Sequence, residues 1–407
     1  MSEFIQIHPL TAYPPACLNR DDLGRPKTAH VGNRERLRIS SQCLKRAWRT
    51  SDLFRDYREQ GMGVRTKEMG LLLYKLLENG NEKSLFHMIR DKDTPAHITT
   101  KTTLDQDRVQ GIEQVMNLFA ECVGLPKKEK MNDAKALKVV LTTKQPVHFS
   151  PEEIEALDEL IQRIRTGEVV IRTEAERKAA KTGKDMPPPI DDKKLDLLRT
   201  QTQAFDIAMF GRMLASSPLY NKEAAVQVSH AFTVHPSAVE NDYFSAVDDL
   251  NYHEEESGAA HIGEAGFGAG LFYNYVCVNR TLLEGNLPDY DEKKIEKLLQ
   301  ALLHAVTQVS PTGKQNSFAS RALSHYVRVE KGFDQPRSLA LAFYNPCSED
   351  DMLAESIRKI EKMAQNLDTA YGQTWRTETL KVEESGCEGT LEKLAEFIAN
   401  PAEDGQS

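Results

Sequence analysis

The stretch 36-RLRISSQCLKRAWR-49 carries five Arg or Lys side chains and no acidic one, in a chain of 407 residues whose formal net charge is −9. Ser40 or Ser41 is a typical N-cap, so we predict a helix from there to about Thr50. The four residues before the cap alternate in the manner of a β-strand. A basic strand that leads into a Ser-capped helix combines cations, hydroxyls and backbone N–H groups, which suits phosphate binding.

Side-chain periodicity supports this interpretation. The alternation places Arg36 and Arg38 on one side of the strand. On the helix, Gln42, Lys45 and Arg49 recur at i, i+3 and i+7 and form a polar face opposite the apolar one. The alternative is an ordinary amphipathic helix at the protein surface.

The charge distribution is uneven. Between Arg20 and Arg49 there are nine basic residues and three acidic ones, a net charge of +6. Because the whole chain has a net charge of −9, the residues outside this segment have a net charge of −15. A locally basic segment on an acidic protein favours a confined groove that binds anions. A solvated charged face is the alternative explanation.

Composition excludes several classes of protein. An apolar fraction of 40% and a charged fraction of 28% are typical of globular proteins, and no stretch is long and apolar enough to span a membrane. The first ten residues have no export-signal pattern. The six cysteines are dispersed without a CxxC pair, which predicts neither a zinc site nor a disulfide framework. We therefore expect a cytoplasmic protein without a metal or another cofactor.

Period-2 and period-3.6 patterns predict an α+β protein. Strands are expected at 4–10, 36–39, 225–235, 271–279 and 337–345. Helices are expected at 69–80, 111–125, 151–164 and 292–309, with a closing helix at 351–367. The charged segment 173–194 contains three consecutive prolines and is expected to be an exposed loop. The order suggests a core interrupted twice, by a helical region at about 55–200 and by a projecting hairpin at 240–270.

Short motifs in a definite order resemble the CasC family, the repeated backbone subunit of the type I-E CRISPR surveillance complex Cascade. The matching motifs are LNRDD (18–22), RISSQ and LKRA (38–47), DIAMFGRM (206–213), SHAFTVH (229–235), AVDDL (246–250) and SGAAHIG (257–263), with TGKQ (312–315) as a weaker echo. The resemblance implies a palm with a modified ferredoxin-like or RNA-recognition fold, helical fingers and a β-hairpin thumb. On this chain the palm would comprise 1–55, 200–239 and 271–407, the fingers 56–199 and the thumb 240–270.

The resemblance also implies a function. In that family several copies line up along one CRISPR RNA, grip its phosphates and kink out nucleotides at intervals, so that the guide can pair with target DNA. Further copies of the chain, other Cascade subunits, CRISPR RNA and target DNA would be the partners, with no membrane involved. Base pairing would supply the sequence specificity.

Individual roles follow only from matching positions in the motifs. Contacts to guide phosphates and riboses are implied for Asn19, Arg20, Lys27, Arg38, Ser40, Gln42, Lys45 and Arg49, the last replacing the family's usual lysine. Arg212 and Met213 would bind RNA near the kinked nucleotide, with Met213 as an apolar wedge, and Lys314 and Gln315 would add contacts. The thumb would include Tyr243, Phe244, Val247, His261 and Phe267.

The chain departs from the family in residues 126–200, which are longer and more charged than expected, and the aromatic signature of RNA-recognition sheets is absent. We expect no catalytic activity. The alternative is a metal-dependent endoribonuclease that cuts target RNA with Asp21 or Asp22 as the catalytic acid. Such acid pairs are also common as loop and capping residues.

Overall fold

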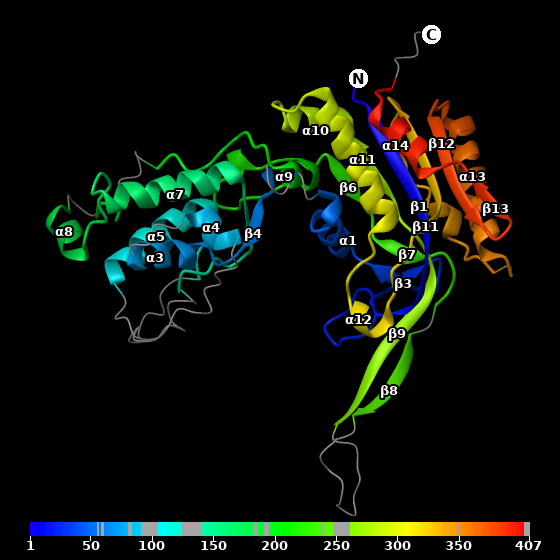
Figure 1. Ribbon diagram of the computed structural model, residues 1–407, viewed down its shortest axis with the longest axis horizontal. Helices are drawn as coiled ribbons and strands as arrows, with labels where there is room; N and C mark the ends of the chain where they lie inside the picture. The colour runs from blue at the N-terminus through cyan, green and yellow to red at the C-terminus, as the bar shows by residue number, and fades with distance from the viewer. Residues whose placement is uncertain are drawn as a thin grey trace, which may run out of the picture. The chain divides into compact units, whose positions relative to one another are not determined.

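The computed structural model (Figure 1) describes residues 1–54, 57, 61–79, 84–90, 105–123, 140–181, 186–190, 195–237, 239–246, 261–348 and 350–402. The chain divides into two compact units. Unit 1 contains residues 1–56 and 225–407, and unit 2 contains residues 57–224. Within the described residues, no helix is both long and apolar enough to cross a membrane.

Unit 1 is built on a large antiparallel sheet around strand β1 (Phe4–Ala16). On one side β1 pairs with β11 (Ser324–Gly332), and on the other it pairs with β10 (Val276–Asn279) and β9 (His261–Tyr273). Strand β10 in turn pairs with β6 (Val226–Val228). The α+β class predicted from the sequence is confirmed.

Both faces of this sheet are covered, which is why β1 is buried over most of its length. Helix α11 (Glu292–Gln308) contacts β1 and β11 on one face, together with α14 (Leu391–Ala399). Helix α13 (Met352–Tyr371) lies on the opposite side (Figure 1). There the core includes Leu10, Tyr273, Tyr326, Phe343, Ile357 and Ile360.

The first predicted helix forms where expected. Helix α1 (Ser41–Arg49) follows Ser40 as N-cap and ends at Thr50. It is preceded by β3 (Arg34–Ile39), which pairs with the edge strand β2 (Thr28–Val31).

The predicted hairpin is confirmed in its described part. Strand β8 (Glu240–Ala246) pairs antiparallel with the first half of β9, from His261 to Phe267. The second half of β9 continues into the main sheet, where Leu271 to Tyr273 pair with β1. The hairpin is therefore an extension of a sheet strand (Figure 1), which anchors it at its base.

Two of the predicted strands are each broken into two. Residues 225–235 form β6 and β7 (Ala231–Thr233), and residues 271–279 lie in β9 and β10. The breaks face each other, because the Ser229 N–H donates to the Tyr275 carbonyl at 2.8 Å. After the break, β7 pairs with β3 and β9, whereas β6 pairs with β10. The single strand pattern at 225–235 therefore corresponds to two strands with different neighbours.

The strand predicted at 337–345 is wrong. Residues 340–343 form a short 3-10 turn, η5, because Leu339 and Phe343 bury their side chains under the sheet at helical spacing. The strand beside β1 is instead β11, whose buried Glu330 and half-buried Arg328 hid its period from the sequence pattern. Helix α13 also does not close the chain, since β12 (Arg376–Glu383), β13 (Gly386–Glu388) and α14 follow it.

Unit 2 is mainly helical, as predicted. Its described helices include α3 (Met69–Asn79), α4 (Leu85–Arg90), α5 (Gln106–Phe119), α7 (Pro151–Arg165), α8 (Glu174–Ala179) and α9 (Phe205–Phe210). A ribbon of β4 (Val64–Thr66) and β5 (Val147–Phe149) was not predicted. The loop expected at 173–194 begins instead with helix α8, because Thr173 and Glu176 form a capping box. The helix has no buried residue, so the predicted exposure is correct for this part of the segment.

The boundary expected at residue 200 moves to residue 224. Residues 200–224 group with unit 2, because the Gln203 N–H donates to Glu152 at 2.8 Å and the Arg199 N–H donates to Glu153 at 3.2 Å. Both carboxylates belong to the first turn of α7. The other boundary, expected after residue 55, lies at residue 56.

Candidate nucleic-acid interface

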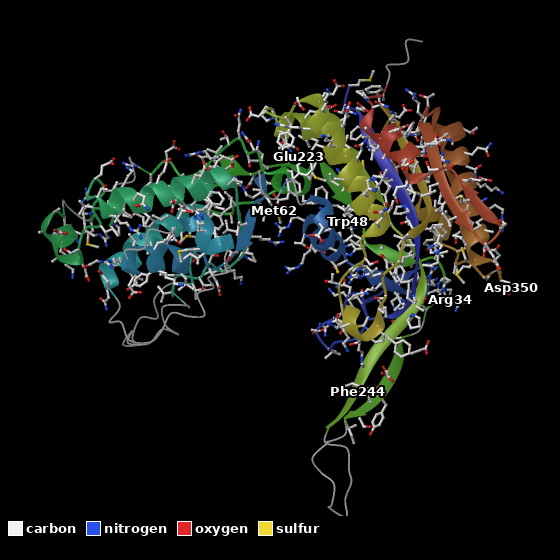
Figure 2. All side chains as sticks on the ribbon, viewed as in Figure 1. Arg34, Trp48, Met62, Glu223, Phe244 and Asp350 are labelled. Atoms are coloured by element: carbon white, nitrogen blue, oxygen red, sulfur yellow. The ribbon has the colours of Figure 1, made fainter. Side chains whose placement is uncertain are left out.

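The N-terminus of α1 is held by two polar side chains. Ser40 Oγ accepts the Cys43 N–H at 3.3 Å, and the Ser40 N–H itself donates to Asn19 Oδ1 at 2.9 Å. Leu44 and Trp48 are buried beneath the helix (Trp48 is labelled in Figure 2). The cap therefore joins the helix to the preceding loop while the polar face of the helix stays outward.

On that polar face Gln42 is exposed, and Lys45 and Arg49 are half-buried. Burial lowers the pKa of Lys45. A partly desolvated ammonium group gains more from an anion than a fully hydrated one, because the local dielectric constant is lower. The predicted face is confirmed as a surface of α1.

The loop at 17–27 is closed by its own polar groups. Asp21 Oδ1 accepts the N–H groups of Leu23 and Arg25 at 3.0 and 2.9 Å, and the Lys27 N–H donates to the Asn19 carbonyl at 2.9 Å. This folding leaves the side chain of Arg20 exposed. A closed loop presents its cations without a large entropic cost on binding.

A second group of cations lies where β3 meets β7. Arg38 donates to His230 Nδ1 at 2.8 Å and to the Thr28 carbonyl at 3.4 Å. Burial, followed by the positive charges of Arg38 and Lys27, lowers the pKa of His230. His230 thus stays neutral and orients Arg38. His230 lies in the strand predicted at 225–235, and its place in the SHAFTVH motif was the one signal in the sequence for a further role.

The TGKQ loop meets the same region. A Cβ on Gly313 would lie 2.4 Å from the Leu18 carbonyl oxygen, so the two loops approach as closely as glycine permits. Burial raises the pKa of the Cys17 thiol, while the nearby charges of Lys314 and Arg20 oppose that shift. Lys314 therefore lies beside the loop at 17–27, and Gln315 follows it as the first residue of α12 (Gln315–Phe318).

These contacts bring together residues from four segments of unit 1, which we call the basic surface. It consists of Asn19, Arg20, Lys27, Arg38, Ser40, Gln42, Lys45, Arg49, Lys314 and Gln315. The base of the hairpin adjoins it, since Phe267 packs against Phe318 with ring centres 6.1 Å apart and Gly266 packs against Pro26. The surface presents guanidinium, ammonium and amide donors, the groups that bind phosphate and ribose oxygens. Ser40 is buried and contributes by capping α1.

Known proteins share this fold and sequence pattern. The family model of the CT1975-like proteins, Cas_CT1975, matches residues 5–398. The chain belongs to the CT1975-like family. No curated protein matches it. The Cas designation of the family agrees with the CRISPR-associated family to which the motifs pointed.

Solved structures agree with that assignment. One, titled "CRISPR RNA-guided surveillance complex, pre-nicking", is 26% identical with a TM-score of 0.73, covering 97% of this chain and 99% of that one. Another, titled "CRISPR RNA-guided surveillance complex", is 23% identical with a TM-score of 0.63 at the same coverage, and it supports the fold. The CT1975-like chain is thus similar over nearly its whole length to a component of such a complex.

Arg36 is buried in this CT1975-like chain, whereas Arg38, two residues further along β3, is half-buried. The Arg36 side chain is fully buried, and its guanidinium donates to the carbonyls of Thr233 at 2.8 Å and Phe343 at 3.2 Å. Leu37 and Ile39 are buried on the other side of the strand. Only Arg38 of the two arginines belongs to the basic surface, because the Arg36 guanidinium lies in the interior between β7 and η5.

Arg212 and Met213 lie in unit 2, in a loop after α9. The Arg212 guanidinium is buried against the carboxylate of Glu153 at 2.5 Å, which argues against the direct RNA contact expected from the resemblance. Met213 is 76% exposed, as an apolar wedge would have to be. Its role stays a prediction.

The hairpin carries exposed aromatic residues. Tyr243 and Phe244 are exposed (Phe244 is labelled in Figure 2), and the Phe244 ring lies over Gly263, where a Cβ would meet it at 2.4 Å. Phe267 is half-buried against α12. Of the other expected thumb residues, Val247 and the side chain of His261 lie outside the described part of the chain.

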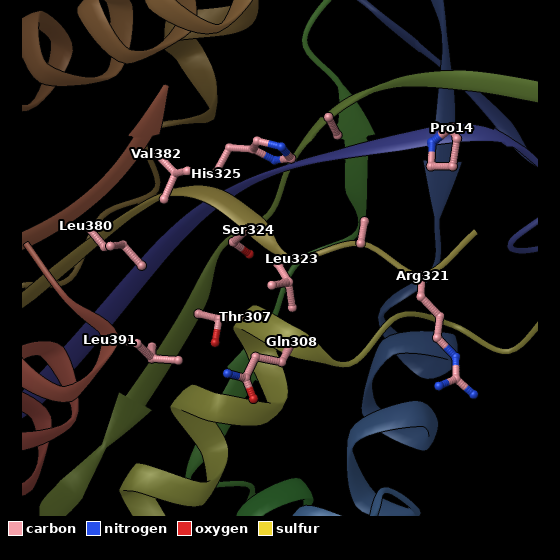
Figure 3. Close-up of a pocket in the computed structure, with 12 residues that line it drawn as sticks. Pro14, Thr307, Gln308, Arg321, Leu323, Ser324, His325, Leu380, Val382 and Leu391 are labelled. Atoms are coloured by element: carbon pink, nitrogen blue, oxygen red, sulfur yellow. The ribbon is translucent and has the colours of Figure 1, made fainter. Parts of the chain in front are cut away.

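A pocket of about 550 Å³ also lies in unit 1, near the end of α11, strand β12 and the start of α14 (Figure 3). Leu323, Leu380 and Val382 give it a mainly apolar lining, and Arg321 supplies a cation at one end. This lining suits an apolar group better than a phosphate. The pocket is lined by none of the residues of the basic surface.

Proposed function

We propose that this chain is a non-catalytic backbone subunit of a type I-E CRISPR surveillance complex, Cascade, in the cytoplasm. Several copies would bind along one CRISPR RNA, grip its phosphates and kink out nucleotides, so that the guide pairs with invading DNA. The observation that carries the proposal is the basic surface, where loops far apart in the sequence converge through the Asn19–Ser40 hydrogen bond and the close approach of Gly313 to Leu18.

The strand order of unit 1 supports the palm assignment. The neighbours β11, β1, β10 and β6 are all antiparallel, with helix α1 between β1 and β6 along the chain and α11 between β10 and β11. This is a βαββαβ connection, the ferredoxin-like pattern, with unit 2 inserted after α1. Helix α13 and η5 cover the sheet face opposite α11, so RNA would be bound by loops and helix ends instead of by stacking on the sheet.

Binding of this kind is independent of base sequence. Arg, Lys and amide side chains together with a helix N-terminus contact phosphate and sugar oxygens, which every nucleotide carries. Specificity would come from the guide through base pairing, as in other RNA-guided complexes. The acidic remainder of the chain limits adhesion to unrelated nucleic acids.

The alternative of an endoribonuclease has less support. Asp21, one of its two candidate acids, uses Oδ1 to close the loop at 17–27, as a turn-forming residue does. Among the described residues, no three His, Cys, Asp or Glu side chains gather as metal ligands would. Incubation of the loaded protein with paired RNA and Mg²⁺ decides the matter: cleavage that is lost in Asp21→Ala or Asp22→Ala would establish the nuclease and remove the scaffold proposal.

The decisive test of the scaffold is stoichiometry. The chain is assembled with its partner subunits on CRISPR RNAs whose guide segments differ in length, and the mass of each complex is measured. We expect the number of copies to rise by one for each fixed increment of guide, and to be the same for unrelated guide sequences. A copy number that does not change with guide length would contradict the proposal.

A further inference from the structure

The loop at 211–224 of unit 2 presents apolar side chains to solvent. Met213 is 76% exposed and Leu219 is 90% exposed, whereas Arg212 and Leu214, the neighbours of Met213, are buried. Single exposed apolar side chains are common at protein surfaces and are not necessarily held in one position. Here the loop beneath them is fastened at several points.

The Arg212 guanidinium makes most of the contacts that hold the loop. One terminal nitrogen lies 2.5 Å from Glu153 Oε2 and also donates to the His148 carbonyl at 3.3 Å. The other donates to the carbonyls of Tyr220 at 3.0 Å and Arg199 at 3.3 Å. One side chain therefore joins β5, α7, the segment before α9 and the far end of its own loop.

The loop backbone closes around the same residue. The Arg212 N–H donates to the Lys222 carbonyl at 3.0 Å, and the Lys222 N–H returns a bond of 2.9 Å. The Leu214 N–H donates to Asn221 Oδ1 at 2.6 Å. Gly211 has a φ of 77° and lies against Ala224, so only glycine suits the entry to the loop. Met213 is thus held between two fixed neighbours.

A buried ion pair is a weak source of stability, because its desolvation offsets its Coulombic attraction. Its clearest benefit is geometric, since the fork of Arg212 accepts only one arrangement of the four segments that it joins. A wedge that is held in place before binding loses less conformational entropy when it inserts. Methionine is one of the side chains that proteins insert between nucleotide bases.

We propose that Arg212 and Glu153 form a buried clamp that holds the loop at 211–224 and so positions Met213 to unstack a base of single-stranded RNA. Arg212 is then a positioning residue and makes no phosphate contact. This inference rests on the proposed function, because it needs bound CRISPR RNA. It replaces the direct contact that the resemblance implied for Arg212.

The test uses the full chain assembled on CRISPR RNA in which 2-aminopurine is placed at successive guide positions. Its fluorescence rises where a base is unstacked, and the salt dependence of binding is measured in parallel. The variants are Met213→Ala, the charge-removing pair Arg212→Met/Glu153→Gln, and Asn221→Ala, which loosens the loop without leaving a buried charge. Ser216→Ala, at an exposed position of the same loop, is the matched control.

We expect the periodic fluorescence maxima to be lost in Met213→Ala and at least halved in Asn221→Ala and the paired variant, with an unchanged log–log salt slope. Ser216→Ala should behave as wild type. Should the paired variant fail to fold, Asn221→Ala alone decides. A slope reduced by about one charge, with the maxima retained, would show that Arg212 contacts phosphate and overturn the clamp. Unchanged maxima in Asn221→Ala would also overturn it, whereas wild-type protein that ignores RNA would refute the proposed function.

Discussion

The backbone N–H of Ser40, the N-cap of α1, donates a hydrogen bond of 2.9 Å to Oδ1 of Asn19 in the loop at 17–27. The start of α1 therefore depends on two successive hydrogen bonds. Asn19 orients Ser40, and Ser40 Oγ satisfies the Cys43 N–H at the start of the helix. The basic surface depends on this relationship, because it sets α1 against the loop at 17–27.

Asn19→Ala should lower the free energy of unfolding by about 1–3 kcal/mol, because it leaves the partly buried Ser40 N–H without its acceptor. RNA affinity should fall with an unchanged salt slope, since no charge is removed. Urea unfolding and salt titrations measure the two effects. Leu23→Ala, exposed in the same loop, is the control, and a steeper or shallower slope in Asn19→Ala would contradict the expected role.

Lys45→Ala/Arg49→Ala should reduce the log–log salt slope of CRISPR RNA binding by about one to two charges. With two cations removed, fewer phosphates are neutralised and fewer counterions leave the RNA on binding. The loss should be equal for guides of different sequence. Arg358→Ala/Lys362→Ala removes the same charge from α13, on the opposite face of the sheet, and should leave the slope unchanged. Equal slopes for the wild type and the α1 variant would mean that α1 does not contact RNA phosphates.

Gly313→Ala should separate the TGKQ loop from the loop at 17–27, because its Cβ would lie 2.4 Å from the Leu18 carbonyl oxygen. We expect a loss of about 1–3 kcal/mol in stability, as for other overpacked contacts, and weaker RNA binding as Lys314 moves. Gly285→Ala is the matched control. Nothing lies within 4 Å of its Cβ, and its position in α10 (Arg280–Asn286) favours a gain of about 0.5–1 kcal/mol. RNA affinity that is identical in both variants would contradict the arrangement.

A buried network beneath η5 predicts sensitivity to acid. Burial opposes the ionisation of Glu330, but His8, Arg328 and Arg337 together lower its pKa to about 2. Burial also lowers the pKa of His8 from its usual 6.5, although Glu330 lies 3.6 Å from its Nε2. Both groups therefore bind protons more readily in the unfolded chain.

Stability should consequently fall as pH drops below 6.5, where the unfolded chain protonates His8, and fall further from 4.5 toward 2, where it protonates Glu330. Urea unfolding between pH 8 and pH 3 measures this profile. His8→Gln should flatten the part between pH 7 and pH 5, and it should also weaken the fall below pH 4.5, because His8 helps to lower the pKa of Glu330. If the variant keeps that slope, His8 is not its origin.

Local patterns in the sequence predicted several elements correctly. The Ser40 cap, the polar face of α1, the helices of unit 2 and α11 all depend on contacts between residues close in the chain, and the hairpin depends on two strands that adjoin in sequence. The basic segment was visible for the same reason, since its charges are adjacent. The motifs indicated a CRISPR-associated family, in agreement with the family model and the similar solved structures.

Other features were decided only by the tertiary structure. Arg36 looked like part of the basic face and is buried, because two distant segments, at Thr233 and Phe343, enclose its guanidinium. Arg212 looked like an RNA ligand and is clamped by Glu153, a residue 59 positions earlier. Strand β11 lies beside β1 but was not predicted, because buried polar residues such as Glu330 break its apolar pattern. The apolar run at 337–345 was predicted as a strand but contains the turn η5, which covers the sheet. In each case burial depends on which distant segment packs there, and that is a property of the whole fold that local periodicity does not carry.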